Sequence, residues 1–251
     1  MVRRDELVGY VNELLQVDGF RDYAPNGLQV EGRDEIRRLA TAVTASYAAM
    51  EAAAAMGADA LLVHHGFFWQ GEEPRVVGMK RRRLALLLGQ DINLLAYHLP
   101  LDAHPDYGNN AQLARVLGIR IQGRFGPEPA LAVHGELPAP MEAEEFARHI
   151  ARCLGREPLH VAGKGAGAIR RIGWCTGAAQ KFIEDAALLG LDAYLSGEAS
   201  EQTFHAAQEM GIHFFGAGHH ATERYGVMAL GEHLSSKYSL EHQIIDEANP
   251  I

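Results

Sequence analysis

The chain alternates between short apolar runs, which predict strands, and longer stretches with apolar residues three or four positions apart, which predict amphipathic helices. Residues 5–16 show the helical spacing, with Leu7, Val11, Leu14 and Leu15 on one face. Further strands are predicted at 39–46, 59–65, 92–98, 130–137, 172–177, 192–198, 213–219 and near 242–246. Further helices are predicted at 47–57, 79–90, 109–118, 142–155, 178–190, 200–211 and about 220–235.

Strands that alternate with helices in this way predict an α/β fold, with largely parallel or mixed sheets flanked by helices. The composition changes near residues 124–130, where glycine and proline are frequent. This change is the best candidate for a boundary between two parts of the chain.

Composition and charge limit the classes of partner. A formal net charge of -9 repels a phosphate backbone and disfavours nucleic acid as a partner. The basic run at 80–83 leaves one alternative open, in which nucleic acid passes through a ring lined by these residues. The two cysteines, Cys153 and Cys175, are far apart and predict no disulfide framework. No apolar run approaches the length of a membrane span, and residues 1–17 lack a signal-type apolar core, so we expect a cytoplasmic protein.

Polar side chains recur where the predicted strands end. Ligands of open α/β sheets bind outside the carboxyl ends of the strands, so these residues are candidates for one functional site. They are His64 and His65 after 59–63, His98 and then Asp102 after 92–97, Glu198 after 192–197, and His219 and then Glu223 after 213–218. A single histidine at a strand end is more often structural, and the joint occurrence is what favours a site.

The residue types predict a metal site. His219 and Glu223 are four residues apart and face the same way in a helix. His64 and His65 are adjacent, and at a strand end both can point into one crevice, toward two different ions. Imidazole and carboxylate donors without thiolates suit Zn, Mn, Fe or Co, and carboxylate-bridged ion pairs are typical of two-metal hydrolysis.

Several motifs carry a family resemblance. They are NGLQV (26–30), LLVHHGFFW (61–69), YHLPLDAHPDYGNNAQLA (97–114), WCTGAAQKFI (174–183), LSGEASEQT (195–203) and GHHATERYGV (218–227). Together they resemble the GTP cyclohydrolase I type 2 homologues, which are the NGG-interacting-factor-three-like dinuclear metal proteins. The resemblance covers nearly the whole chain and fits the short bacterial subfamily. One departure is that many relatives read HHP where this chain reads HHG, followed by three aromatic residues at 67–69.

The resemblance implies two α/β lobes, a toroidal homohexamer and two divalent metal ions per chain. We expect residues 1–124 plus 220–251 to form the first lobe and residues 125–219 the second, with the metal pair held between them. The five implied ligands are His64, His65, Asp102, His219 and Glu223. The implied sharing places His65 and Asp102 on one ion, His64 and His219 on the other, and Glu223 as a bridge.

The function that this resemblance implies is a dinuclear metal-dependent hydrolase acting on a small nucleotide or related heterocycle, with the GTP cyclohydrolase I reaction as the specific form. His98 and Glu198 are candidate proton-transfer residues, because both lie at strand ends near the implied ligands. The alternative function is a non-catalytic, ring-forming scaffold whose ions only stabilise the fold. Five ligands for two ions leave coordination positions open, which favours catalysis.

Overall fold

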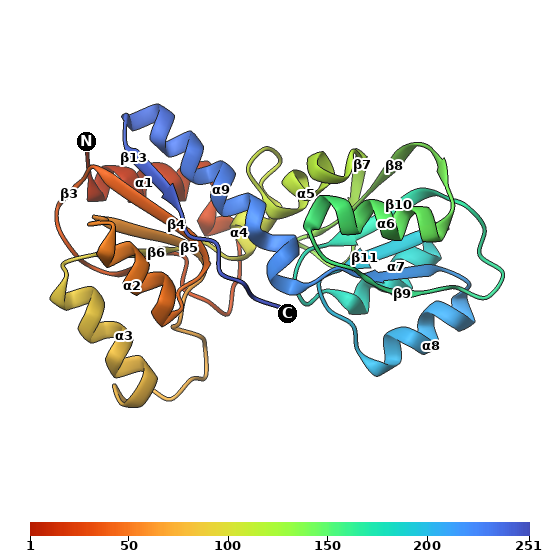
Figure 1. Cartoon of the computed structure of the whole chain (residues 1–251), viewed down its shortest axis with the longest axis horizontal. Helices are drawn as coiled ribbons and strands as arrows, with labels where there is room; N and C mark the ends of the chain where they lie inside the picture. Colours follow the sequence, from red (N-terminus) through yellow and green to blue (C-terminus); the bar gives the residue numbers. More distant parts are fainter. The chain divides into compact units, whose positions relative to one another are not determined.

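The computed structural model describes all of residues 1–251 and divides the chain into two compact units. Unit 1 comprises Met1–Gly108 and Gly226–Ala248, and unit 2 comprises Asn109–Tyr225 and Asn249–Ile251. Each unit is built on its own β-sheet with flanking helices (Figure 1), which confirms the predicted α/β class.

Unit 1 contains a five-stranded sheet in the order β13-β4-β5-β6-β2, in which only the β2 edge is antiparallel. The strands of the unit are β1 (Val2–Arg3), β2 (Gly27–Val30), β3 (Glu35–Ile36), β4 (Arg38–Thr44), β5 (Ala60–His65), β6 (Asn93–Ala96) and β13 (Glu241–Ile244). Its helices are α1 (Arg4–Leu14), the 3-10 turn η1 (Val17–Gly19), α2 (Tyr47–Ala55), α3 (Gly78–Gly89), α4 (Leu99–Ala103) and the greater part of α9 (His219–Tyr238).

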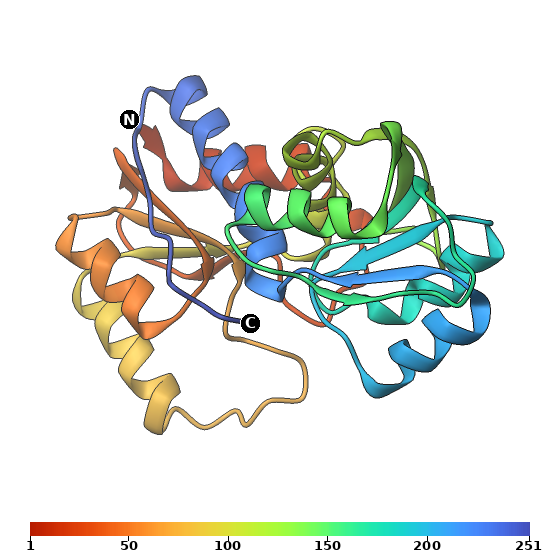
Figure 2. The same ribbon diagram turned by 45° about the vertical axis from the view of Figure 1, so that its right-hand side comes forward.

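Alternate residues of the central strands of unit 1 pack into two cores. Leu39 of β4 and Leu62 of β5 pack with apolar residues of α1 and α9 on one face of the sheet. Ala40 and Leu61 pack with α2 and α3 on the opposite face, and Figures 1 and 2 show the two pairs of helices on opposite sides of the sheet. The central strands β4, β5 and β6 are buried in nearly every position, because both faces of the sheet are covered.

Unit 2 contains a six-stranded mixed sheet in the order β7-β8-β10-β11-β12-β9, with parallel pairing only among β10, β11 and β12. Its strands are β7 (Arg120–Phe125), β8 (Ala132–Met141), β9 (Leu159–Val161), β10 (Ile169–Cys175), β11 (Ala193–Ser196) and β12 (His213–Gly216). Its helices are α5 (Asn109–Leu117), α6 (Ala143–Leu154), the 3-10 turn η2 (Gln180–Phe182), α7 (Ile183–Leu188), α8 (Glu201–Met210) and the start of α9. Residues of α5 and α6 share one core with the sheet, and residues of α7 and α8 share the other.

The boundaries of these units differ from those of the predicted lobes. Residues 109–124 were expected in the first lobe, but Leu113 and Leu117 of α5 lie in the core of unit 2 and β7 pairs with β8. Residues 220–225 also belong to unit 2, whereas α9 from Gly226 onward belongs to unit 1, as expected for the C-terminal helix. The change in composition near residues 124–130 lies at the turn between β7 and β8. These two strands pair in one sheet of unit 2, so the change does not mark the boundary between the units.

Helix boundaries follow local sequence signals. Ser46 precedes α2, and its hydroxyl accepts a hydrogen bond of 2.9 Å from the Ala49 amide, as expected of an N-cap. The helix α6 is capped at its C-terminus by Gly155, whose φ of 73° is the left-handed conformation that glycine adopts without strain. None of the helices combines the length and the apolar character that a membrane crossing requires.

Candidate functional site

Three imidazoles lie together at the ends of two adjacent parallel strands of unit 1. His64 and His65 end β5, and His98 follows β6, which pairs with β5. The ring centroids lie 4.5 Å apart for His64 and His65, 5.1 Å for His64 and His98, and 5.7 Å for His65 and His98. One nitrogen of each ring lies within 4.8 Å of the others, so the three rings form a possible set of metal ligands.

The structure corrects the predicted position of His98. The expected strand 92–98 ends earlier, because β6 stops at Ala96 and His98 is the N-cap residue of the short helix α4. Pro100 in the first turn of α4 favours a helix start, since proline lacks the amide hydrogen that this turn does not use. This helix places Asp102 Oδ1 3.6 Å from His64 Nε2.

Each imidazole of this cluster is held by a second group. Nδ1 of His64 donates to the Tyr97 carbonyl at 2.9 Å, which leaves the Nε2 lone pair as the donor toward a metal. Nδ1 of His65 lies 3.3 Å from the Thr44 hydroxyl. Nδ1 of His98 lies 2.9 Å from the Asp22 carboxylate. Groups of this kind orient metal-binding imidazoles in known sites.

No sequence motif indicated Asp22, which organises the loop before β2. Its carboxylate accepts hydrogen bonds from the amides of Ala24 and Leu99 in addition to the contact with His98. Burial alone would raise the pKa of Asp22, but the hydrogen bond and charge of His98, with further hydrogen bonds, lower it to about 2. Because Asp22 and His98 are 76 residues apart, no local spacing pattern could have found the pair.

We predict that Asp22→Asn destabilises the metal-free protein in a pH-dependent way. The pKa of Asp22 falls from 3.8 to about 2 on folding, so the charged carboxylate stabilises the fold above pH 4. The free energy of unfolding should be about 2 kcal/mol lower for the variant at pH 7, and this difference should vanish as the pH falls from about 4 to about 2. Urea denaturation at several pH values measures it. Asp18→Asn, at an exposed position of η1, is the control, and a pH-independent difference would contradict the prediction.

Unit 2 holds a second group of donors at the ends of two adjacent parallel strands. Glu198 follows β11 and His219 follows β12, although the structure makes His219 the first residue of α9, because β12 already ends at Gly216. Nδ1 of His219 lies 2.7 Å from Glu198 Oε1, and its Nε2 lies 3.1 Å from Glu223 Oε2. The spacing of four residues places His219 and Glu223 on one helix face, as predicted.

The backbone around Gly177 packs closely against this second group of donors. The amide of Gly177, after β10, donates to the Thr222 hydroxyl at 3.1 Å, and the amide of Gly197 donates to the Gly177 carbonyl at 2.9 Å. Gly177 has a φ of 67°, and a Cβ at this position would collide with the Glu223 carboxylate. Glycine is therefore required here for Glu223 to keep its position.

The charges of this second group also fit a cation. Burial lowers the pKa of the His219 imidazole, but the hydrogen bonds and charges of Glu223 and Glu198 outweigh it and raise the pKa to about 9. Without a metal, His219 is therefore protonated at pH 7 and its positive charge faces two carboxylates. A divalent cation that replaced this proton would be attracted by the same two carboxylates.

The donors of both units fit divalent transition metals. The Glu223 and Asp102 residues are only 3% and 7% exposed, and buried carboxylates need a cationic partner. The imidazole nitrogens and carboxylate oxygens are the ligand types of Zn, Mn, Fe and Co. Unit 1 thus brings together His64, His65, His98 and Asp102, and unit 2 brings together Glu198, His219 and Glu223.

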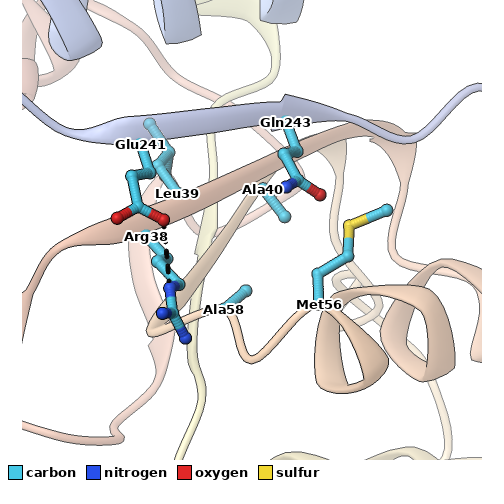
Figure 3. Close-up of a pocket in the computed structure, with 7 residues that line it drawn as sticks. All are labelled: Arg38, Leu39, Ala40, Met56, Ala58, Glu241 and Gln243. Carbon is cyan, nitrogen blue, oxygen red and sulfur yellow. Dashed lines mark hydrogen bonds and ion pairs between the residues drawn. The ribbon is translucent and has the colours of Figure 1, made fainter.

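A small pocket elsewhere in unit 1 contains only one such donor. It lies beside the edge strand β13, between Arg38, Met56, Glu241 and Gln243 (Figure 3). Its one carboxylate, that of Glu241, pairs with Arg38 at 3.1 Å, and it contains no histidine. This pocket is therefore no candidate metal site.

Comparisons with known proteins identify the family of the chain. Residues 2–250 match the model of the Duf34/NIF3 (NGG1p interacting factor 3) family. A relative from Pseudomonas aeruginosa is 55% identical over 247 residues, which are 97% of each chain, and one from Escherichia coli (strain K12) is 50% identical over 99% of this chain and 100% of its own. Both are named GTP cyclohydrolase 1 type 2 homolog.

The fold comparison gives the same answer. A solved structure described as "Structural genomics, protein ybgI, unknown function" matches with a TM-score of 0.97 and 50% sequence identity over 100% of both chains. A structure of TTHA1606 from Thermus thermophilus matches with a TM-score of 0.88 and 34% identity over 100% of both chains. The resemblance seen in the sequence is thereby confirmed, and the chain belongs to the Duf34/NIF3 family.

Proposed function

We propose that the protein is a dinuclear metal-dependent hydrolase that acts on a nucleotide or a related heterocycle. The observation that carries this proposal is the pair of donor groups, in which the proposed ligands His64, His65 and His219 each have a second group against Nδ1. Such orientation is typical of metal ligands. The name of the relatives, GTP cyclohydrolase 1 type 2 homolog, supports a nucleotide substrate.

The proposed ligands are the five residues that the resemblance implied. His65 and Asp102 would hold one ion, His64 and His219 the other, and Glu223 would bridge the two. Bound divalent ions supply a Lewis acid and an activated water for hydrolysis. With two ions sharing five protein ligands, coordination positions remain for water and substrate.

The specific reaction that we propose is the GTP cyclohydrolase I type. One water would add to C8 of the guanine ring, and the bond from C8 to one ring nitrogen would break, which leaves a formamide on the other nitrogen. A second water would hydrolyse this formamide, so that C8 leaves as formate and both nitrogens keep a proton. This chain must then bind the heterocycle with C8 near the donors, and it must supply or accept protons as the carbon–nitrogen bonds break.

His98 and Glu198 are the residues proposed to manage protons or to orient ligands. Glu198 lies 2.7 Å from Nδ1 of the proposed ligand His219, which supports an orienting role. Nδ1 of His98 contacts the Asp22 carboxylate and its Nε2 lies 3.5 Å from the Tyr23 hydroxyl. One of its ring nitrogens lies within 4.8 Å of a ring nitrogen of His64 and of His65. This arrangement also suits a group that supports metal binding.

We therefore predict that His98→Ala weakens metal binding by about 10–100-fold and that excess metal restores activity. The competing outcome is that His98 carries a proton. In that case metal affinity would hold while kcat fell by about 10²–10⁴-fold. Metal titrations and turnover measured on the same preparation separate the two. His205→Ala, at an exposed histidine of α8, is the control for loss of an imidazole.

The proposed function is tested by a nucleotide screen. The metal-free protein is reconstituted with each of Zn, Mn, Fe and Co and incubated with GTP, other nucleotides and pterin precursors, and formate release is measured. We expect formate release that requires the metal and is lost in Glu223→Ala. Full metal loading without turnover of any of these compounds would refute the hydrolase and favour the scaffold function.

The proposed assembly is a homohexamer. This proposal rests on family resemblance, and the small-molecule substrate would be reached within the ring. Light scattering on the purified chain should give six times the chain mass of 27.4 kDa. A monomer at the concentration used for the activity assays would contradict it.

A further inference from the structure

Two large aromatic side chains border the imidazole cluster of unit 1. The rings of Tyr23 and Trp69 are stacked, with centroids 5.6 Å apart and planes at 30°. Both are nearly perpendicular to His98, at 74° and 5.0 Å for Tyr23 and at 85° and 5.4 Å for Trp69. The Trp69 ring also lies 6.0 Å from that of His65.

The loops that carry the two rings are fixed by contacts within unit 1. The Gln70 amide donates to the Tyr23 carbonyl at 2.8 Å and so joins the two loops directly. Asp22, which precedes Tyr23, is anchored by the amide of Leu99 at 3.0 Å. Gly66 packs so closely on the Gln29 side chain that a Cβ would collide with it. These contacts therefore fix the positions of the Tyr23 and Trp69 rings in the folded unit.

The aromatic residues of the 67–69 run have different environments. Phe67 is 5% exposed and lies under the guanidinium of Arg83, and Phe68 lies under the ammonium of Lys80, both on α3. Trp69 instead stacks with Tyr23, which is 55% exposed. Packing of α3 explains the two phenylalanines, but it does not explain a tyrosine–tryptophan stack at the surface beside a polar cluster.

We propose that Tyr23 and Trp69 bind the planar heteroaromatic ring of the substrate by stacking. This inference rests on the proposed function and names the residues that would select its substrate class. Aromatic side chains stack on the faces of nucleobases, and each such contact contributes measurably to affinity. The centroids of the Tyr23 and Trp69 rings lie 5.0–6.0 Å from those of His98 and His65, so a heterocycle stacked on either ring would be next to the imidazole cluster.

The competing account is that the two rings only shield His98 from water. Shielding would make the variants lose metal affinity, whereas stacking makes them lose affinity for the heterocycle even when metal is absent. Binding to the metal-free protein therefore separates the two accounts. Trp69 is also a suitable reporter, because the only other tryptophan, Trp174, is fully buried in unit 2.

The test uses chelator-treated full-length protein titrated with GMP and, separately, with ribose 5-phosphate, which lacks the base. We expect GMP to quench the Trp69 fluorescence and ribose 5-phosphate to leave it unchanged. Calorimetry should show GMP bound about tenfold or more weakly by Tyr23→Leu and by Trp69→Leu. Tyr23→Phe and Trp69→Phe keep an aromatic face and should bind GMP within about threefold of the wild type.

Equal binding of GMP and ribose 5-phosphate, or unchanged GMP affinity in Trp69→Leu, would overturn the stacking inference. Circular dichroism verifies that each variant is folded, and Trp69→Leu suffices if Tyr23→Leu does not fold. The outcomes also separate this inference from the proposed function. GMP binding lost in both leucine variants, with no formate release by the loaded wild type, refutes the hydrolase alone. Formate release with an unchanged KM in Trp69→Leu refutes the stacking alone.

Discussion

Replacing Glu223 with alanine is expected to reduce the metal content from two ions per chain to fewer than one. Glu223 is 3% exposed, lies 3.1 Å from His219 Nε2, and is the proposed bridge between the ions. Removing a bridging carboxylate takes one ligand from each of the two ions. It also removes the negative charge that reduces the repulsion between the two cations. The measurement is elemental analysis of the purified variant after gel filtration in metal-free buffer.

Glu232→Ala is the matched control, because Glu232 is an exposed glutamate on the same helix. It should retain two ions per chain. Glu223→Gln keeps the side-chain shape and removes the charge, so it separates the loss of a ligand from a change in packing. A Glu223→Ala protein that still holds two ions per chain would contradict the bridging role.

Replacing Trp174 with alanine is expected to lower the free energy of unfolding of unit 2 by about 4 kcal/mol. Trp174 is fully buried in the core shared by α5, α6 and the sheet. Its Nε1 donates to the Asn110 carbonyl at 3.0 Å, so the substitution leaves both a cavity and a buried carbonyl without its donor. The same strand leads into Gly177, and we therefore expect weaker metal binding as well.

Urea denaturation measures the effect of Trp174→Ala, and hydrogen exchange shows which unit loses protection. Trp69→Ala is the control that the chain itself offers, because this tryptophan is only partly buried and its loss should cost less than about 1 kcal/mol. A loss of less than about 1 kcal/mol in Trp174→Ala would contradict the prediction.

Many strands and helices could be predicted because the spacing of their apolar residues shows in the local sequence. The predicted strand 59–65 corresponds to β5 over Ala60–His65, and the predicted helix 79–90 corresponds to α3 over Gly78–Gly89. The short helix α4 was missed because five residues are too few to show a helical period. The edge strand β7 was missed because most of its residues are exposed and it lacks an apolar alternation.

The candidate site was predicted in part, for physical reasons that differ between its residues. His64 and His65 were found because they interrupt an apolar strand at its end. The spacing of His219 and Glu223 was found because a helix converts four residues into one face. Asp22 and Thr44, which contact His98 and His65, were missed because those contacts depend on how distant segments pack.

We propose that the chain holds two divalent metal ions through its histidine and carboxylate side chains. Elemental analysis of the wild-type protein, loaded with each candidate metal and then passed through a desalting column, tests it most directly. We expect two ions per chain for at least one of Zn, Mn, Fe and Co. A content well below one ion per chain for all four metals would contradict it.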